Sequence, residues 1–382
     1  MKTASRKAFF VVAVLVVAFV IAMVLARFGT AQSVPTAGKT AEEAYKNIQV
    51  LKGVPADQVI PAMQFMSASL GVECEHCHVE HAMDKDDKKP KQTARKMMQM
   101  MFAINKDNFN GHREVTCYSC HHGVADPVGT PLVADAGTMP EPRGAMNPEA
   151  AKPAAMPPAD QIVDKYVQAL GGAAALEKIS SRVEKGNLTG FGDRQFPIEV
   201  YAKVPDKRLS VMHMPNGESI TAYDGRSGWL GFSHGPPHPM TPPEANSARM
   251  DADFLFALRL KQNFSQLRVE HPEKVGGQET YLVVGANPGQ PPVRLYFSQE
   301  SALLVRLVRY VETPLGRNPT QIDYADYREV DGIKVPFRWT LARPSGRFTI
   351  QVDQCQQNVP IDDTKFSMPP APAPAATKPS SP

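Results

Sequence analysis

The sequence predicts an α+β protein in which a small, mostly helical domain precedes a separate, mainly antiparallel β domain. Three observations predict this class: an uncharged apolar stretch near the N-terminus, a helix pattern that occurs twice before residue 124, and alternating strands with Asp-Gly turns after residue 180. A chain of 382 residues favours two or three domains. The net charge of +3 is too balanced for a protein that binds nucleic acid.

The N-terminal apolar stretch is the first predicted element. Residues 8–26 carry no charge and follow three basic residues. Their length lies between the apolar core of a signal peptide, about 7–15 residues, and a membrane-spanning helix, about 20 residues. Because basic residues stay on the cytoplasmic side, we expect the rest of the chain at the periplasmic side of the inner membrane. Residues 1–31 are therefore predicted to be a transmembrane anchor, with a signal peptide cleaved after Ala31 as the alternative.

Composition sets the remaining domain boundaries. Residues 41–124 are rich in Met and His and hold four of the five cysteines. Residues 125–158 are rich in Pro and Ala with little periodicity, which is typical of a linker. Residues 159–368 are predicted to form the β domain, and residues 369–382 a disordered tail of Pro, Ala and Ser.

Two Cys-x-x-Cys-His motifs lie in the segment 41–124. This pattern is that of c-type haem attachment. Two thiols on one helical turn can each form a thioether with a haem vinyl group, and the adjacent histidine then lies beneath the iron. We therefore predict two covalently bound c-type haems. The predicted attachment residues are Cys74 and Cys77 in the first motif and Cys117 and Cys120 in the second, and the predicted proximal iron ligands are His78 and His121.

Zinc binding and a redox disulfide are the two alternatives for these cysteines. Paired zinc motifs usually lie about 15–20 residues apart, whereas 39 residues separate Cys77 from Cys117. A thioredoxin-like site needs a βαβ surround, and the sequence predicts none there. The fifth cysteine, Cys355, is expected to be a half-buried thiol at a strand end.

A methionine-bearing helix is predicted before each motif. Residues 60–71 place Met63 and Met66 on one face, with a proline in the first turn and Gly71 after the last. Residues 93–108 contain Met97, Met98, Met100 and Met101. Methionine sulfur can be the sixth ligand of a haem iron, although soft filling of a core is the alternative for any single methionine. The charged run from Asp84 to Lys91 is predicted to be a solvated loop.

Residues 47–124 resemble the cytochrome c subunit of photosynthetic reaction centres. The similar stretches are Met63 to His78, Ala94-Arg95-Lys96-Met97, and Val115 to His121. That family binds haem in helix–turn–helix units, mostly with Met and His as axial ligands. The resemblance implies Met63 and Met97 as the distal ligands, with Met66, Met100 and Met101 as near alternatives. The family form carries four haems, whereas this chain has motifs for two.

The β domain begins with an amphipathic helix over residues 162–170 and continues as strands. Asp224-Gly225 and Asp331-Gly332 are hairpin signals. The strand pattern resembles that of periplasmic lipoprotein carriers, whose half-open antiparallel barrel holds acyl chains on its concave face.

Electron transfer without a substrate is the predicted function. The expected partners are redox proteins, namely a membrane electron-transfer complex or reaction centre and a small periplasmic carrier, and the expected membrane contact is the N-terminal helix. A dihaem peroxidase is one alternative. A lipid or ligand carrier with a haem sensor is the other.

Overall fold

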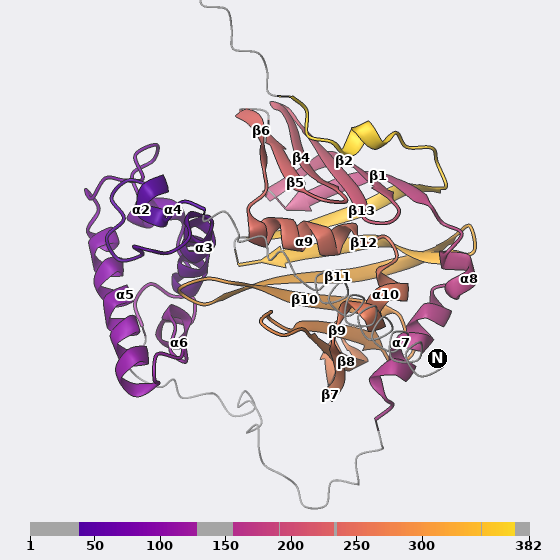
Figure 1. Ribbon diagram of the computed structural model, residues 1–382, viewed down its shortest axis with the longest axis horizontal. Coiled ribbons are helices and arrows are strands. Elements are labelled where there is room, and N and C mark those ends of the chain that lie inside the picture. Colours follow the sequence, from indigo (N-terminus) through magenta and orange to yellow (C-terminus); the bar gives the residue numbers. More distant parts are fainter. Residues whose placement is uncertain (1–37, 128–155, 191, 233–234, 345, 371–382) are drawn as a thin grey trace, which may run out of the picture.

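The computed structural model describes residues 38–127 and 156–370, except 191, 233–234 and 345 (Figure 1). The predicted anchor at residues 1–31, most of the predicted linker and the predicted tail lie outside the described residues. Among the residues that are described, no helix has the length and apolar character needed to cross a membrane.

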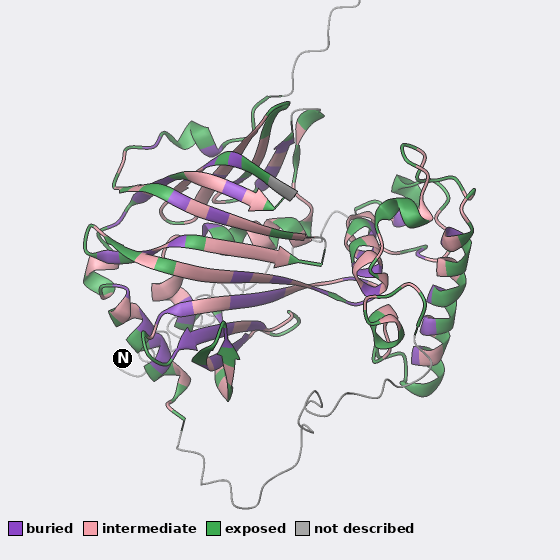
Figure 2. Ribbon diagram, turned by 180° about the vertical axis from the view of Figure 1, so that it is seen from behind, coloured by how far each residue is buried: buried purple, intermediate pink, exposed green. Residues whose placement is uncertain are grey.

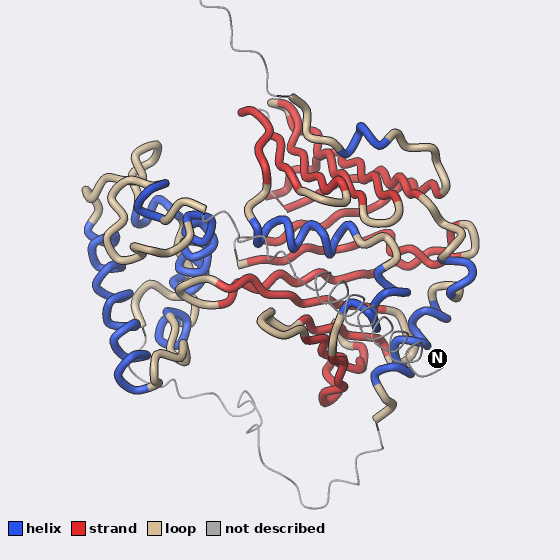
Figure 3. Tube along the Cα trace, in the orientation of Figure 1, coloured by secondary structure: helices blue, strands red, loops and turns tan. Residues whose placement is uncertain are grey.

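Residues 38–127 form helices and loops beside the sheet (Figure 3). Gly71 ends the helix before the first motif in the left-handed conformation, at φ 65°, as its position in the sequence predicts. The helix before the second motif begins at Lys89, four residues earlier than predicted, because Pro90 fits its first turn. The elements are α2 (Ala41–Ala44), η1 (Ala56–Gln58), α3 (Val59–Leu70), α4 (Cys74–Cys77), α5 (Lys89–Asn108) and α6 (Cys117–His121).

Residues 181–357 form one antiparallel sheet, which confirms the mainly antiparallel β prediction. The strand order in the described chain is β6-β5-β4-β3-β2-β1-β13-β12-β11-β10-β9-β8-β7. Strands that are consecutive in the sequence pair with each other, except β6 and β7, which form the two edges of the sheet. In addition, β1 pairs with β13 and joins the two halves. The strands are β1 (Ser181–Gly190), β2 (Gly192–Lys203), β3 (Lys207–Met214), β4 (Gly217–Asp224), β5 (Gly228–Phe232), β6 (Gly235–Pro239), β7 (Gln266–Val275), β8 (Gln278–Ala286), β9 (Val293–Ser298), β10 (Leu304–Glu312), β11 (Arg317–Val330), β12 (Ile333–Arg343) and β13 (Gly346–Gln357).

Short helices pack on this sheet. Helix α9 crosses the face that Figure 1 turns toward the viewer and lies behind the strands in Figure 2. The apolar face of α7, which carries Ile162 and Tyr166, packs with Leu260 of α10 and Phe297 of β9 in the largest buried cluster. The remaining elements are α7 (Ala159–Ala169), α8 (Ala173–Leu176), α9 (Pro242–Ala252), α10 (Phe256–Asn263) and η2 (Asp363–Phe366).

The hairpin of β10 and β11 reaches out of the sheet and contacts the helical segment (Figure 1). Its tip residue Leu315 is fully buried in the apolar cluster that holds Phe65, Met66 and Met101. Asn318 Nδ2 donates a hydrogen bond to the Pro61 carbonyl at 2.6 Å. The helical segment and the sheet therefore share one piece of hydrophobic core, which the sequence did not predict.

The hairpin carries further contacts to the loop before the second motif. Arg113 donates hydrogen bonds to the Thr313 carbonyl and to the Glu312 carboxylate. A methyl group added at Gly316 would lie 2.2–2.7 Å from ring atoms of Phe65. The absence of a side chain at Gly316 therefore permits this close approach.

Candidate haem site

The first motif forms the short helix α4, directly after Gly71 has ended α3. Cys74 is exposed and Cys77 is half-buried, and burial raises the pKa of the Cys77 thiol. His78 follows the helix in extended conformation, and its Nδ1 lies 2.8 Å from the Met83 carbonyl oxygen. Because a carbonyl only accepts, Nδ1 is the donor in this bond, which leaves Nε2 as the ring nitrogen that could ligate a metal.

The second motif forms α6, whose first turn is capped by Thr116 together with Ser119. Cys117 is half-buried, and burial raises the pKa of its thiol. The Nδ1 of His121 lies 3.0 Å from the Val124 carbonyl oxygen. The two motif histidines therefore share one arrangement, in which a backbone carbonyl fixes the ring and leaves Nε2 available as a ligand.

Asn105 on α5 holds the loop in front of the second motif. Its side-chain amide donates to the Val115 carbonyl at 2.7 Å, and its oxygen accepts from the backbone N–H groups of Glu114 and Val115. Asn105 is buried, so these bonds form away from water. This role was not predicted, because the partners are loop residues whose position depends on the fold.

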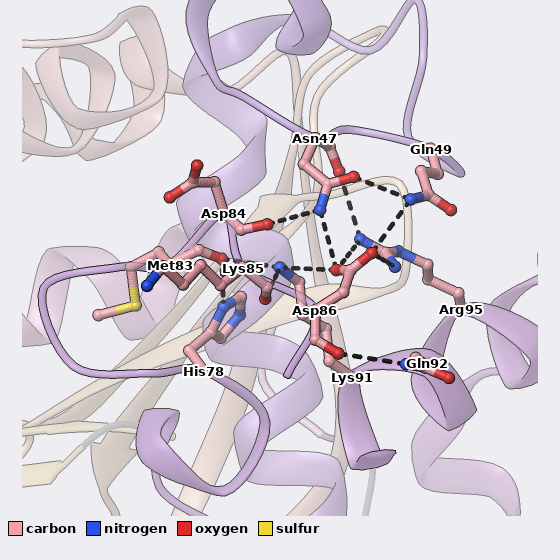
Figure 4. A network of polar contacts seen from close by, with 10 residues as sticks. All are labelled: Asn47, Gln49, His78, Met83, Asp84, Lys85, Asp86, Lys91, Gln92 and Arg95. Carbon is pink, nitrogen blue, oxygen red and sulfur yellow. Dashed lines mark hydrogen bonds and ion pairs between the residues drawn. The ribbon is translucent and has the colours of Figure 1, made fainter. Parts of the chain in front are cut away.

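A polar network holds the loop after the first motif (Figure 4). Both oxygens of Asp86 accept from the Arg95 guanidinium, at 2.8 and 2.9 Å, and one accepts from Asn47 Nδ2 at 2.9 Å. The hydrogen bond from Arg95 holds the pKa of the Asp86 carboxyl well below its usual range. Lys91, which also contacts Asp86, is only 9% exposed. The prediction of a solvated loop from Asp84 to Lys91 is therefore wrong at Lys91, which is buried and lies on α5, whereas the Asp86 side chain is still 36% exposed.

A cavity of about 320 Å³ lies between α5 and the second motif. It gathers residues of both motifs: His76 and Cys77 from the first, and Cys117, Cys120 and His121 from the second. The methionines that line it are Met66 from α3 and Met97, Met98, Met100 and Met101 from α5. A thioether-linked macrocycle needs an apolar cavity beside its attachment thiols and an imidazole nearby, and the residues present here fit that group.

The predicted residues of the first unit are less closely gathered. Within the described chain, Met63, Cys74 and His78 are not among the residues that line this cavity. Met63 instead packs against the apolar cluster around Phe65 and Leu315. The C-terminal end of α3 lies against the segment after the second motif, where the Gly123 N–H donates to the Ser69 carbonyl at 2.9 Å. The two units are thus packed together, and residues of both motifs line the same cavity.

Zinc binding and a redox disulfide are the alternative roles of the cysteines. None of the five cysteines is paired in a disulfide, and the pKa of Cys355 on β13 is raised to about 11 by burial. In the described part of the chain, no group of three or more His, Cys, Asp or Glu side chains could hold a metal ion.

The helical segment has known relatives among the c-type cytochromes. Residues 23–159 match the family model of the photosynthetic reaction centre cytochrome C subunit. The resemblance predicted from the sequence is confirmed. The chain is 33% identical over 104 residues to the photosynthetic reaction center cytochrome c subunit of Thermochromatium tepidum, which covers 25% of this chain and 26% of the relative.

A second relative is cytochrome c-554 of Chloroflexus aurantiacus, 34% identical over 85 residues, which covers 20% of each chain. The chain thus spans about a quarter or less of the length of these curated relatives. Both relatives are named as cytochromes c, the class that the two motifs predict.

Two solved structures are each similar to 56% of this chain. A DUF1329 family protein from Desulfovibrio piger matches with a TM-score of 0.41 and 12% identity, over 56% of this chain and 98% of that chain. A LolA superfamily protein from Nitrosomonas europaea matches with a TM-score of 0.38 and 13% identity, over 56% and 98%.

Proposed function

We propose that this chain is a dihaem c-type cytochrome that passes single electrons between redox proteins and has no substrate of its own. The observation that carries the proposal is the gathering of the second motif and the methionines of α5 at one apolar cavity. The cytochrome c relatives of the helical segment support it.

The cysteines, histidines and methionines of the predicted sites would each hold the cofactor in a different way. The thiols of Cys74 and Cys77, and those of Cys117 and Cys120, would form the thioether links. His78 and His121 would bind iron through Nε2, oriented by the carbonyls of Met83 and Val124. Met63 and Met97 would supply the distal sulfur ligands.

A bound haem supplies a one-electron iron couple, and the protein sets its potential. Methionine sulfur favours the reduced iron, so distal methionine raises the potential. The apolar lining from Met66, Met98 and Met101 would limit water at a bound cofactor, which would favour its less charged state. The chain's own residues thus tether the cofactor, orient its ligands and exclude solvent.

The domain organisation and location belong to the same proposal. Residues 41–124 would be the dihaem domain and residues 159–368 the β domain, joined by the linker 125–158. Residues 8–26 would anchor the chain at the periplasmic side of the inner membrane. The partners would be a membrane electron-transfer complex or reaction centre and a small periplasmic carrier.

Redox titration of the purified protein tests the proposed function. We expect full reduction by dithionite and reversible reoxidation by ferricyanide, with one electron per haem and two per chain. The variant Cys117→Ser/Cys120→Ser should take up one electron, and Cys355→Ser, which removes a thiol outside the motifs, should still take up two. Electron uptake that is the same in the Cys117→Ser/Cys120→Ser variant as in the unmodified protein would contradict the proposal.

A further inference from the structure

The Met83 carbonyl accepts from two side chains at once. One donor is His78 Nδ1, at 2.8 Å, and the other is the Lys91 ammonium, at 2.9 Å (Figure 4). The proposed proximal ligand of the first haem therefore shares its hydrogen-bond acceptor with a cation. Met83 and Lys91 are eight residues apart in the sequence, and they come into contact because the loop that carries Met83 folds back onto α5.

The ammonium of Lys91 is fixed in place. Its side chain is 11% exposed and has three acceptors: the Met83 carbonyl, the Lys85 carbonyl at 2.7 Å, and Asp86 Oδ1 at 3.2 Å. An ammonium has three N–H donors, so these contacts use its full capacity. Asp86 also binds Arg95 through both carboxylate oxygens. With two cations and one anion, the group Lys91, Arg95 and Asp86 carries one net positive charge.

The second motif lacks this feature. His121 Nδ1 lies 3.0 Å from the Val124 carbonyl. Among the hydrogen bonds of the described residues, no lysine or arginine donates to that carbonyl. The two motif histidines thus have the same backbone acceptor geometry and differ in the charge beside it.

A cation on the shared carbonyl acts on the histidine in two ways. It draws electron density from the oxygen, which weakens that oxygen as acceptor for the histidine N–H and makes the imidazole a weaker electron donor to a metal. Its charge also disfavours a nearby site that becomes more positive on oxidation, and burial reduces the screening. Both effects stabilise the reduced state.

We propose that Lys91 is a positioning residue that raises the reduction potential of the haem at the first motif relative to the haem at the second. The inference rests on the proposed function. The protein would then have two unequal potentials. A single electron would reside mainly on the haem at the first motif, because that haem has the higher potential.

The test is a spectroelectrochemical titration of the full-length, haem-loaded protein. In Lys91→Met, which keeps the aliphatic stem, we expect one of the two midpoint potentials to fall and the other to stay. Lys91→Arg should stay close to the unmodified protein because it keeps a charged donor. Lys96→Met is the matched control, since it removes an exposed charge from the same helix; it should leave both potentials in place. Lys91→Met in the Cys117→Ser/Cys120→Ser background, which retains the first motif alone, should show the same fall.

Four outcomes of the potential measurements would overturn the inference. They are unchanged potentials in Lys91→Met, an equal fall of both, a fall equally large in Lys96→Met, and no fall in the background that retains the first motif. Lys91→Gln is the second variant, for the case that Lys91→Met does not bind haem at the first motif. Its neutral amide should give a smaller fall of the same potential. If both variants lose the haem at the first motif and keep the other, Lys91 is only structural and the inference fails. An unmodified protein without attached haem would instead contradict the proposed function.

Discussion

Met97 and its neighbours on α5 lie at different depths. Met97 is 39% exposed, whereas Met98 and Met101 are 6% and 4% exposed. All three line the cavity at the second motif. A distal ligand must reach the iron from the wall of such a cavity, so position on the helix decides which sulfur can bind.

Replacing the proposed distal ligands is the first test at this scale. We expect Met97→Ala and Met63→Ala each to remove about half of the far-red methionine-to-iron charge-transfer band and to lower one potential. Both haems should stay attached, because attachment depends on the cysteines. The near-infrared and visible spectra of the oxidised protein measure this. A band that survives Met97→Ala and halves in Met101→Ala would show that the ligand lies one turn further along α5.

The Asp86 carboxylate gives a prediction about pH. Its pKa is lowered in the folded protein, first by the hydrogen bond from Arg95. A lowered folded pKa means that the stabilisation is present above the unfolded pKa, about 3.9, and is lost as the pH falls toward the folded value. Asp86→Asn should therefore lower the urea midpoint at pH 7, and the gap to the unmodified protein should narrow below about pH 4.

Asp84→Asn is the matched control for that measurement. Asp84 is an exposed carboxylate in the same loop, and the hydrogen bond from Asn47 in Figure 4 is accepted by the Asp84 backbone carbonyl, not by its side chain. It should leave the urea midpoint almost unchanged at both pH values. A gap for Asp86→Asn that is constant from pH 7 to pH 3 would contradict the assigned role of the carboxylate.

At the scale of elements, the tip of the hairpin of β10 and β11 packs into the hydrophobic core of the helical segment. Leu315 at its tip is 0% exposed and packs with Phe65, Met66 and Met101. Two of these partners, Met66 and Met101, also line the cavity. The β sheet thus contributes a side chain to the core on which the candidate haem site is built.

Leu315→Ala should destabilise the helical segment by about 2–5 kcal/mol, the usual cost of truncating a buried leucine. We expect the Soret band to be lost at lower temperature, with a smaller change in the far-ultraviolet dichroism of the sheet. Leu303→Ala is the control, because Leu303 is buried in the sheet's own cluster. The opposite order of effects in the two variants would contradict the role of the hairpin.

Local sequence patterns predicted most of the helices and strands, but they did not predict the contacts between segments that are distant in the sequence. Helix periodicity and Gly71 predicted α3 to within a residue at each end. The Asp331-Gly332 turn joins β11 to β12 with both residues at positive φ, as the hairpin signal requires. By contrast, the contact of Leu315 with Phe65 and the pairing of Asp86 with Arg95 and Asn47 depend on how loops fold back, which periodicity does not encode. Lys91 was assigned to a solvated loop for the same reason.

For the whole molecule, the central proposal is a membrane-anchored electron carrier. If residues 8–26 remain as an anchor, the protein should stay with the membrane fraction after a wash with concentrated salt, since salt releases charge-held proteins and leaves a hydrophobic anchor in place. Immunoblotting of the washed fractions measures this. Recovery of soluble protein that begins near Gln32 would show that the segment is a cleaved signal peptide.

The intact mass of the mature protein tests the central claim most directly, because thioether-bound haem stays on the chain under denaturing conditions. The account predicts a mass that exceeds the polypeptide by two haems, and by one haem in Cys74→Ser/Cys77→Ser or in Cys117→Ser/Cys120→Ser. A mass without added haem, or zinc found by elemental analysis of the same sample, would contradict it.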